Sequence, residues 1–90
     1  MDINDYREQI DQYDRDLLRI FNARAALALK IGEIKKTLEM PVYDPAREKR
    51  IFDKMTADNQ GPLDNSAIIR LFERVIDESR TLERIKTKGV

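Results

Sequence analysis

The feature that most constrains this chain is an apolar seam that occupies residues 3–38. Apolar side chains recur in it at steps that alternate between three and four, the spacing of a long, coiled-coil-like helix. The seam consists of Ile3, Tyr6, Ile10, Tyr13, Leu17, Ile20, Leu27, Ile31, Ile34 and Leu38. A helix of about 36 residues is roughly 54 Å long, whereas a compact domain of 90 residues has a radius of gyration of about 12 Å. The remaining residues are too few to cover such a helix, so we expect a partner chain.

One position breaks the seam. Arg24 stands where the spacing requires an apolar side chain, and Lys35 returns to nearly the same face, because eleven steps of about 100° leave a remainder of only about 20°. A cation in an apolar seam is costly unless an anion meets it. We interpret the helix as one that buries one face and offers two cations to an anion. Two simpler interpretations stay open: Arg24 pairs with a glutamate across a helical interface, and Lys35 reaches solvent.

The composition indicates one all-α domain over residues 1–90 and argues against several classes of protein. The 17 basic and 17 acidic residues cancel, which disfavours a general nucleic-acid or membrane binder. The chain has no cysteine and no histidine, so it lacks thiolate chemistry and the commonest general base and metal ligand. We therefore expect no metal and no cofactor. The longest apolar run, residues 25–29, is too short to span a membrane and no signal peptide is apparent, so we expect a cytoplasmic protein.

Two further helices are expected after the long one. Asp44 followed by Pro45 is a strong start signal and predicts a helix over about residues 45–57, which the breakers at 58–62 end. Asp64 is the expected N-cap of a third helix over about residues 65–86. The expected buried face of this third helix consists of Ile68, Leu71, Phe72, Val75, Ile76 and Leu82.

Polar residues interrupt the apolar faces of the first and third helices and gather at the start of the second. They are Arg24, Lys35, Asp44, Arg47, Glu48, Ser79 and Glu83. Arg24 and Lys35 lie about 16 Å apart along the helix axis, so their long side chains can converge on one small, multiply charged ligand. No nucleophile stands beside a base, so an enzyme built from these residues would act by positioning and electrostatics. The simpler alternatives are that Ser79 bonds back to its own helix, that Glu83 is a surface residue and that Asp44 is only a cap.

Arg7 raises the question of a second chain. It lies about 25 Å along the axis from Arg24 and about 100° around the helix, so the two cannot share a site within one chain. In an antiparallel dimer of long helices, Arg7 of one chain can lie near Arg24 of the other. The alternative is a solvated arginine that pairs with Asp11 or Asp14 at helical spacing.

A set of motifs with consistent spacing runs through nearly the whole chain. It comprises Arg7-Glu8, Asp14, Leu17-Leu18, Arg24, Leu27-Ala28, Ile31-Gly32, Lys35, Pro41-Val42, Asp44, Arg47-Glu48, Ile69, Leu71-Phe72, Ile76 and Ser79. As a set these motifs resemble the all-helical (AroQ-type) chorismate mutases. The resemblance implies an intertwined homodimer of three-helix chains with two sites between the subunits. It also implies the Claisen rearrangement of chorismate to prephenate, a step in phenylalanine and tyrosine biosynthesis.

The same resemblance implies roles at the carboxylate end of this substrate. Arg24, together with Arg7 from the other subunit, would hold the two carboxylates of chorismate. Lys35 would bind a carboxylate and the ether oxygen, and Ser79 would assist one carboxylate. The rearrangement is unimolecular and needs no proton transfer. A preorganised cation at the ether oxygen, where negative charge develops, would stabilise the transition state more than the substrate.

At the other end of the substrate, the resemblance implies that Glu48 accepts a hydrogen bond from the ring hydroxyl, with Asp44 nearby and Arg47 lining the site. Glu83 stands where many bacterial members carry a glutamine, on the far side of the ether oxygen from Lys35. Glutamine donates a hydrogen bond at any pH, whereas a glutamate donates only when protonated. This difference bears on the pH range of the activity.

Two alternative functions stay open at this point. An isochorismate-pyruvate lyase resembles the same fold and binds a similar dianion, and only its products distinguish it. A non-catalytic helical dimerisation or regulatory domain would share the seam without needing Lys35 for a ligand. The chain is compatible with a complete gene product or with one domain of a fusion enzyme.

Overall fold

The computed structural model describes residues 1–88, and its regular structure consists of three helices without a strand among these residues. They are α1 (Ile3–Thr37), α2 (Pro45–Asp58) and α3 (Asn65–Lys88). The all-α class predicted from the sequence is therefore confirmed. Relative to the expected bounds, α1 ends one residue earlier, and α2 and α3 extend further.

Each helix begins at an aspartate that caps it. The Asp2 side chain accepts from the Asp5 backbone N–H at 3.0 Å, and the Asp5 side chain accepts in return from the Asp2 N–H. Asp44 accepts from the Arg47 N–H at 3.0 Å at the start of α2, and Asp64 accepts from the Ala67 N–H at 2.8 Å at the start of α3. These bonds satisfy backbone donors that have no partner inside the helix.

The end of α1 is made by a residue in the left-handed region. Glu39 has a φ of 58°, and the N–H of Met40 reaches back to the Lys35 carbonyl at 2.8 Å. This is the usual way to close a helix, although glycine is the usual residue at such a position. The turn directs residues 40–44 away from the α1 axis towards the start of α2.

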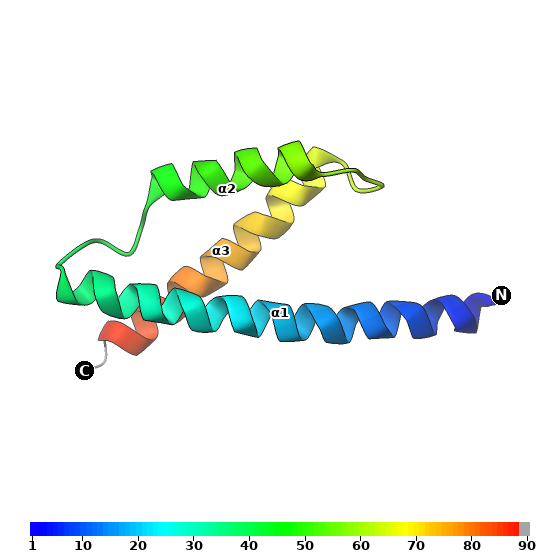
Figure 1. Cartoon of the computed structure of the whole chain (residues 1–90), viewed down its shortest axis with the longest axis horizontal. Helices are drawn as coiled ribbons and strands as arrows, with labels where there is room; N and C mark the ends of the chain where they lie inside the picture. The colour runs from blue at the N-terminus through cyan, green and yellow to red at the C-terminus, as the bar shows by residue number, and fades with distance from the viewer. Residues whose placement is uncertain (89–90) are drawn as a thin grey trace.

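The three helices form an open arrangement in which α3 is the common partner. α3 packs against both α1 and α2, whereas α1 and α2 do not pack on each other, and Figure 1 shows α3 running obliquely between them. The molecule measures 54 × 27 × 14 Å and has a radius of gyration of 16.2 Å, against about 12 Å for a compact domain of this length. The N-terminal half of α1 extends beyond the other helices (Figure 1).

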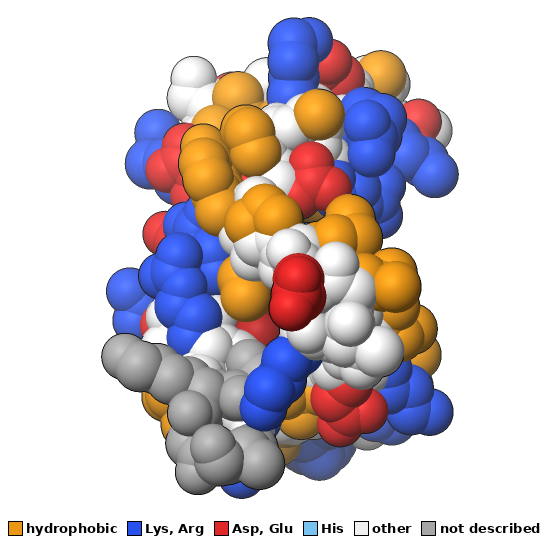
Figure 2. All heavy atoms as spheres, turned by 90° about the vertical axis from the view of Figure 1, so that its left-hand side faces the viewer, with side chains coloured by type: hydrophobic (Ala, Val, Ile, Leu, Met, Phe, Trp, Pro, Cys, Tyr) orange, Lys and Arg blue, Asp and Glu red, His pale blue; other side chains and the backbone are white. Residues whose placement is uncertain are grey.

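This arrangement leaves the chain with little core. Among the described residues, Ile76 is the only hydrophobic side chain that is buried. The apolar seam of α1 is exposed along its whole length, as the exposed fractions of Ile3 (67%), Tyr13 (68%) and Ile34 (60%) illustrate. Figure 2 shows hydrophobic patches among charged side chains at the end of the molecule where α1 finishes. None of the helices in residues 1–88 contains an apolar segment of the length that a membrane span requires.

Of the six residues expected on the buried face of α3, only Ile76 is buried, and Ile68, Phe72, Val75 and Leu82 are half-buried. Leu71 was predicted to be buried, but its side chain is 53% exposed. Leu71 is five residues before Ile76, which places it about 140° around the helix from that buried side chain, and neither α1 nor α2 covers it.

The turn after α1 yields a test of the local structure. Glu39→Gly removes the cost of a side chain in the left-handed region, about 1–2 kcal/mol, against a glycine entropy cost of about 0.5–1 kcal/mol. We expect the free energy of unfolding to rise by up to about 1 kcal/mol, measured by chemical denaturation at one fixed protein concentration. Glu33→Gly, in the exposed interior of α1, is the matched control and should cost about 1 kcal/mol. Equal destabilisation by both changes would contradict this account of the turn.

Candidate active site

A cavity of about 280 Å³ lies between the C-terminal half of α1, the start of α2 and the C-terminal half of α3. Half of its apolar lining residues come from α1, namely Leu27, Ala28 and Ile31. Its polar side chains are Arg24, Lys35, Asp44, Arg47, Glu48, Ser79, Arg80 and Glu83. Every site residue proposed from the sequence is among them except Arg7. Among the described residues, no three or more acidic side chains are grouped so that they could hold a metal ion.

The two basic residues of α1 that line the cavity each donate a hydrogen bond to a neutral oxygen. Arg24 donates through Nη1 to the Ser79 hydroxyl on α3 at 3.0 Å, which shows that Ser79 has a partner across the cavity. Lys35 donates through Nζ to the carbonyl oxygen of Val42 in the α1–α2 loop at 3.1 Å. A neutral acceptor fixes the position of a cation without cancelling its charge. Both side chains are therefore placed for an anionic ligand.

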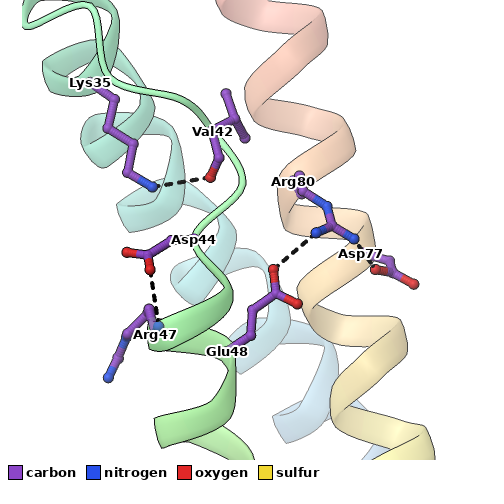
Figure 3. A network of polar contacts seen from close by, with 7 residues as sticks. All are labelled: Lys35, Val42, Asp44, Arg47, Glu48, Asp77 and Arg80. Carbon is purple, nitrogen blue, oxygen red and sulfur yellow. Dashed lines mark hydrogen bonds and ion pairs between the residues drawn. The ribbon is translucent and has the colours of Figure 1, made fainter.

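The start of α2 contributes three polar residues to the cavity lining, and one of them, Asp44, also caps the helix. Asp44 caps α2 and also lines the cavity, so its capping role does not exclude a second one. Figure 3 shows the side chains of Arg47 and Glu48 leaving α2 on opposite sides, with Glu48 directed towards α3. Glu48 accepts there from Arg80 at 2.9 Å.

Arg80 is the polar residue of the cavity that the sequence analysis did not identify. It forms ion pairs with Glu48 on α2 and with Asp77 one turn earlier on α3, at 2.9 and 2.6 Å (Figure 3). Asp77 at helical spacing makes Arg80 look like an ordinary surface arginine. Helical spacing in the sequence does indicate its position. Arg80 is four residues after Ile76 and three before Glu83, so it lies on the same side of α3 as these two buried residues.

Gly32 sets how closely α3 approaches α1. It is the one buried residue of α1, and a Cβ atom placed on it would lie 3.1 Å from Cγ of Glu83 and 3.3 Å from its Cβ. Contacts this short require the neighbour to move. The glycine, which costs about 0.8–1.0 kcal/mol in a helix interior relative to alanine, therefore makes room for the Glu83 side chain.

Glu83 is a buried acid in a cationic cavity. Its side chain is 8% exposed, and burial raises its pKa above the ordinary value because it disfavours the charged form. Lys35 and Arg24 on α1 and Arg80 on α3 oppose this rise by attraction. Burial outweighs the three cations, so the protonated form of Glu83 is favoured relative to a solvated glutamate.

Arg7 lies outside the cavity. It is exposed on the N-terminal part of α1, about 25 Å along the axis from Arg24. Among the described residues it makes no ion pair with Asp11 or Asp14, so that alternative partner is not observed. Its role stays a prediction.

The raised pKa of Glu83 has a consequence for stability. A carboxyl group whose pKa is higher in the folded than in the unfolded chain stabilises the fold fully only below the unfolded value, near 4.5. That contribution is lost as the pH rises through the folded pKa. We expect Glu83→Gln, which does not titrate, to gain stability relative to the unmodified chain between about pH 4 and pH 7. Denaturant midpoints across this range provide the measurement.

The matched control for this experiment is Glu33→Gln, on the exposed face of α1. It should follow the pH dependence of the unmodified chain. Parallel curves for the unmodified chain and Glu83→Gln would show that burial does not favour the protonated form of Glu83.

This chain is similar to known proteins over most of its length. The family model described as chorismate mutase type II matches residues 6–84. A chorismate mutase of Methanocaldococcus jannaschii is 32% identical over 87% of this chain and 80% of its own length. A bifunctional chorismate mutase/prephenate dehydratase of Aquifex aeolicus is 33% identical over 92% of this chain. The chain spans only 24% of that relative's length.

Two solved structures are similar over almost their whole length. A chorismate mutase from Thermus thermophilus superposes with a TM-score of 0.90 and 34% identity, covering 91% of this chain and 93% of that one. A chorismate mutase from Helicobacter pylori, solved in complex with prephenate, has a TM-score of 0.90 and 27% identity and covers 98% and 96% of the two chains.

Proposed function

The chain belongs to the chorismate mutase type II family, and we propose that it catalyses the Claisen rearrangement of chorismate to prephenate. The observation that carries the proposal is the cavity in which Arg24 and Lys35 from α1 meet Glu83 from α3. Chorismate is a dianion with an ether oxygen and a ring hydroxyl, and this cavity offers fixed cations together with a protonatable acid. The likeness to a chorismate mutase solved in complex with prephenate, the product of this reaction, supports the proposal.

The chemistry asks little of the protein beyond positioning and charge. One carbon–oxygen bond breaks and one carbon–carbon bond forms within a single molecule, without proton transfer. Clamping both carboxylates selects the compact conformer in which the reacting carbons are close. Lys35 on one side of the ether oxygen and protonated Glu83 on the other would stabilise the negative charge that develops there.

The remaining residues of the site would bind the two ends of the substrate. Arg24 would hold one carboxylate with the help of Ser79, to which it donates a hydrogen bond. Glu48 would accept a hydrogen bond from the ring hydroxyl, with Asp44 nearby and Arg47 lining the site. All of these residues face the same cavity.

We also propose that the active form is a homodimer in which Arg7 of the partner subunit completes each site. The exposed seam of α1 supports this arrangement, because an apolar surface of this length is costly in water. The position of Arg7 supports it as well, since Arg7 lies outside the cavity of its own chain. An antiparallel pairing of two α1 helices would bring Arg7 of the partner subunit close enough to the cavity to bind the second carboxylate of chorismate.

Incubation of the purified chain with chorismate tests the proposed reaction directly. Loss of the ultraviolet absorbance of chorismate with formation of prephenate is the expected result. A parallel incubation with isochorismate examines the lyase alternative, which would release salicylate and pyruvate. Absence of any turnover, with a folded protein, would favour a non-catalytic dimerisation domain and refute the proposal.

The pH dependence of turnover tests the role of Glu83. Only the protonated side chain donates to the ether oxygen, so kcat should be greatest below the pKa of Glu83 in the complex and fall as the pH rises through it. Glu83→Gln donates at every pH, so its kcat should decline less and exceed that of the unmodified chain at the alkaline end. A parallel decline in both proteins would place another group beside the ether oxygen.

Subunit mixing tests the origin of the second arginine. Lys35→Ala should lower kcat by about 10²–10³, the cost of losing one donor to a developing negative charge, and Arg7→Ala should also be nearly inactive. In a mixed dimer one site carries both changes and the other carries neither. Equal mixing under subunit exchange should therefore restore up to about a quarter of the activity. Failure to recover activity despite demonstrated exchange would assign Arg7 to its own chain.

A further inference from the structure

Arg80 is held by three groups from three parts of the chain. Its Nη1 donates to Glu48 Oε2 on α2 at 2.9 Å, and its Nη2 donates to Asp77 Oδ1 on its own helix at 2.6 Å. Its guanidinium carbon lies 5.1 Å from the centre of the Tyr43 ring in the α1–α2 loop. The side chain is 23% exposed. A planar guanidinium anchored at both ends and covered on one face has little freedom to turn.

These contacts matter because, within residues 1–88, α3 is the only helix on which α2 packs. The orientation of the first turn of α2 towards the cavity therefore depends mainly on α3, together with the hydrogen bond from Lys35 on α1 to Val42 in the loop before α2. Arg80 provides one contact to α2 and one to the loop before it. Figure 3 shows Glu48 drawn from α2 towards Arg80, with Asp77 on the far side of the guanidinium.

The hydrogen bond with Arg80 engages one oxygen of Glu48 and leaves the other as an acceptor. An ionised carboxylate has acceptor sites on both oxygens, and Glu48 lines the cavity. We infer that Arg80 is a positioning residue of the proposed reaction, which orients Glu48 so that its second oxygen receives the ring hydroxyl of the substrate. This inference rests on the proposed function. It assigns Arg80 no contact with the reacting atoms.

A double-mutant cycle separates this role from direct binding of a substrate carboxylate by Arg80. Arg80→Met and Glu48→Gln each remove one side of the ion pair. The ring hydroxyl stands on the carbon next to the one that carries the ether oxygen, but it is not itself part of the bonds that break and form, so a hydrogen bond to it serves mainly to bind the substrate. Both changes should therefore raise KM more than they lower kcat. We expect about a tenfold loss in kcat/KM for Arg80→Met, and no further loss when it is added to Glu48→Gln. Losses that multiply in the double variant would overturn the inference.

A chorismate analogue without the ring hydroxyl sharpens the test. If Arg80 acts through Glu48 on that hydroxyl, the tenfold penalty of Arg80→Met should vanish with this analogue. An undiminished penalty would show that Arg80 acts elsewhere on the substrate. Arg80→Lys keeps a cation near Glu48 without the planar fork and should recover part of the lost kcat/KM. Lysine performing no better than methionine would contradict an action through the ion pair.

The matched control is Arg74→Met on α3. Arg74 pairs with Glu78 at 3.2 Å, but both side chains are exposed and neither lines the cavity. Its kcat/KM should stay within about twofold of the unmodified chain. Circular dichroism and denaturant midpoints establish that each variant is folded. An unmodified chain that fails to convert chorismate would refute the proposed function itself, whereas an active chain in which Arg80→Met has normal KM and kcat would refute only the role of Arg80.

Discussion

The close approach of α3 to α1 at Gly32 determines where the other groups of the cavity lie. α3 is the only helix that packs against both of the others, so its distance from α1 sets the width of the space between α1 and α2 as well. A glycine permits that distance, because a Cβ atom would meet the Glu83 side chain at 3.1 Å. Glu83 is buried as a result, and its burial raises its pKa. The absence of a side chain at Gly32 thus allows the packing of α3 on α1 that buries Glu83 and favours its protonated form.

Two cations of the cavity, Arg24 and Lys35, are held in position by groups that do not neutralise them. Arg24 and Lys35 make their hydrogen bonds to a hydroxyl and a backbone carbonyl, so their charge is retained for a ligand. Arg80 is different, because two carboxylates hold it. The two carboxylates largely neutralise the positive charge of Arg80. This contrast divides the basic residues of the cavity into those suited to bind an anion and one suited to hold another side chain in place.

Local signals in the sequence predicted the helices well, because each aspartate cap acts within three residues of itself. The interruption of the apolar seam identified Arg24 and Lys35 for a related reason, since helical periodicity is also local. Leu71 was predicted wrongly because periodicity defines a face of a helix and not whether another element covers it. Arg80 was missed because Glu48 is 32 positions away in the chain and Asp77 already offered a simple partner. The contribution of Arg7 depends on a second chain and stays a prediction.

The exposed seam of α1 also bears on how the fold is maintained. With Ile76 as its one buried hydrophobic side chain among the described residues, a single chain has little burial to offset the entropy lost on ordering its backbone. Most of the stabilising burial must then come from whatever surface covers α1. Under that condition folding and association become one equilibrium, and mass action makes the folded fraction depend on the amount of protein present. Dilution alone would then shift such a protein towards the unfolded chain.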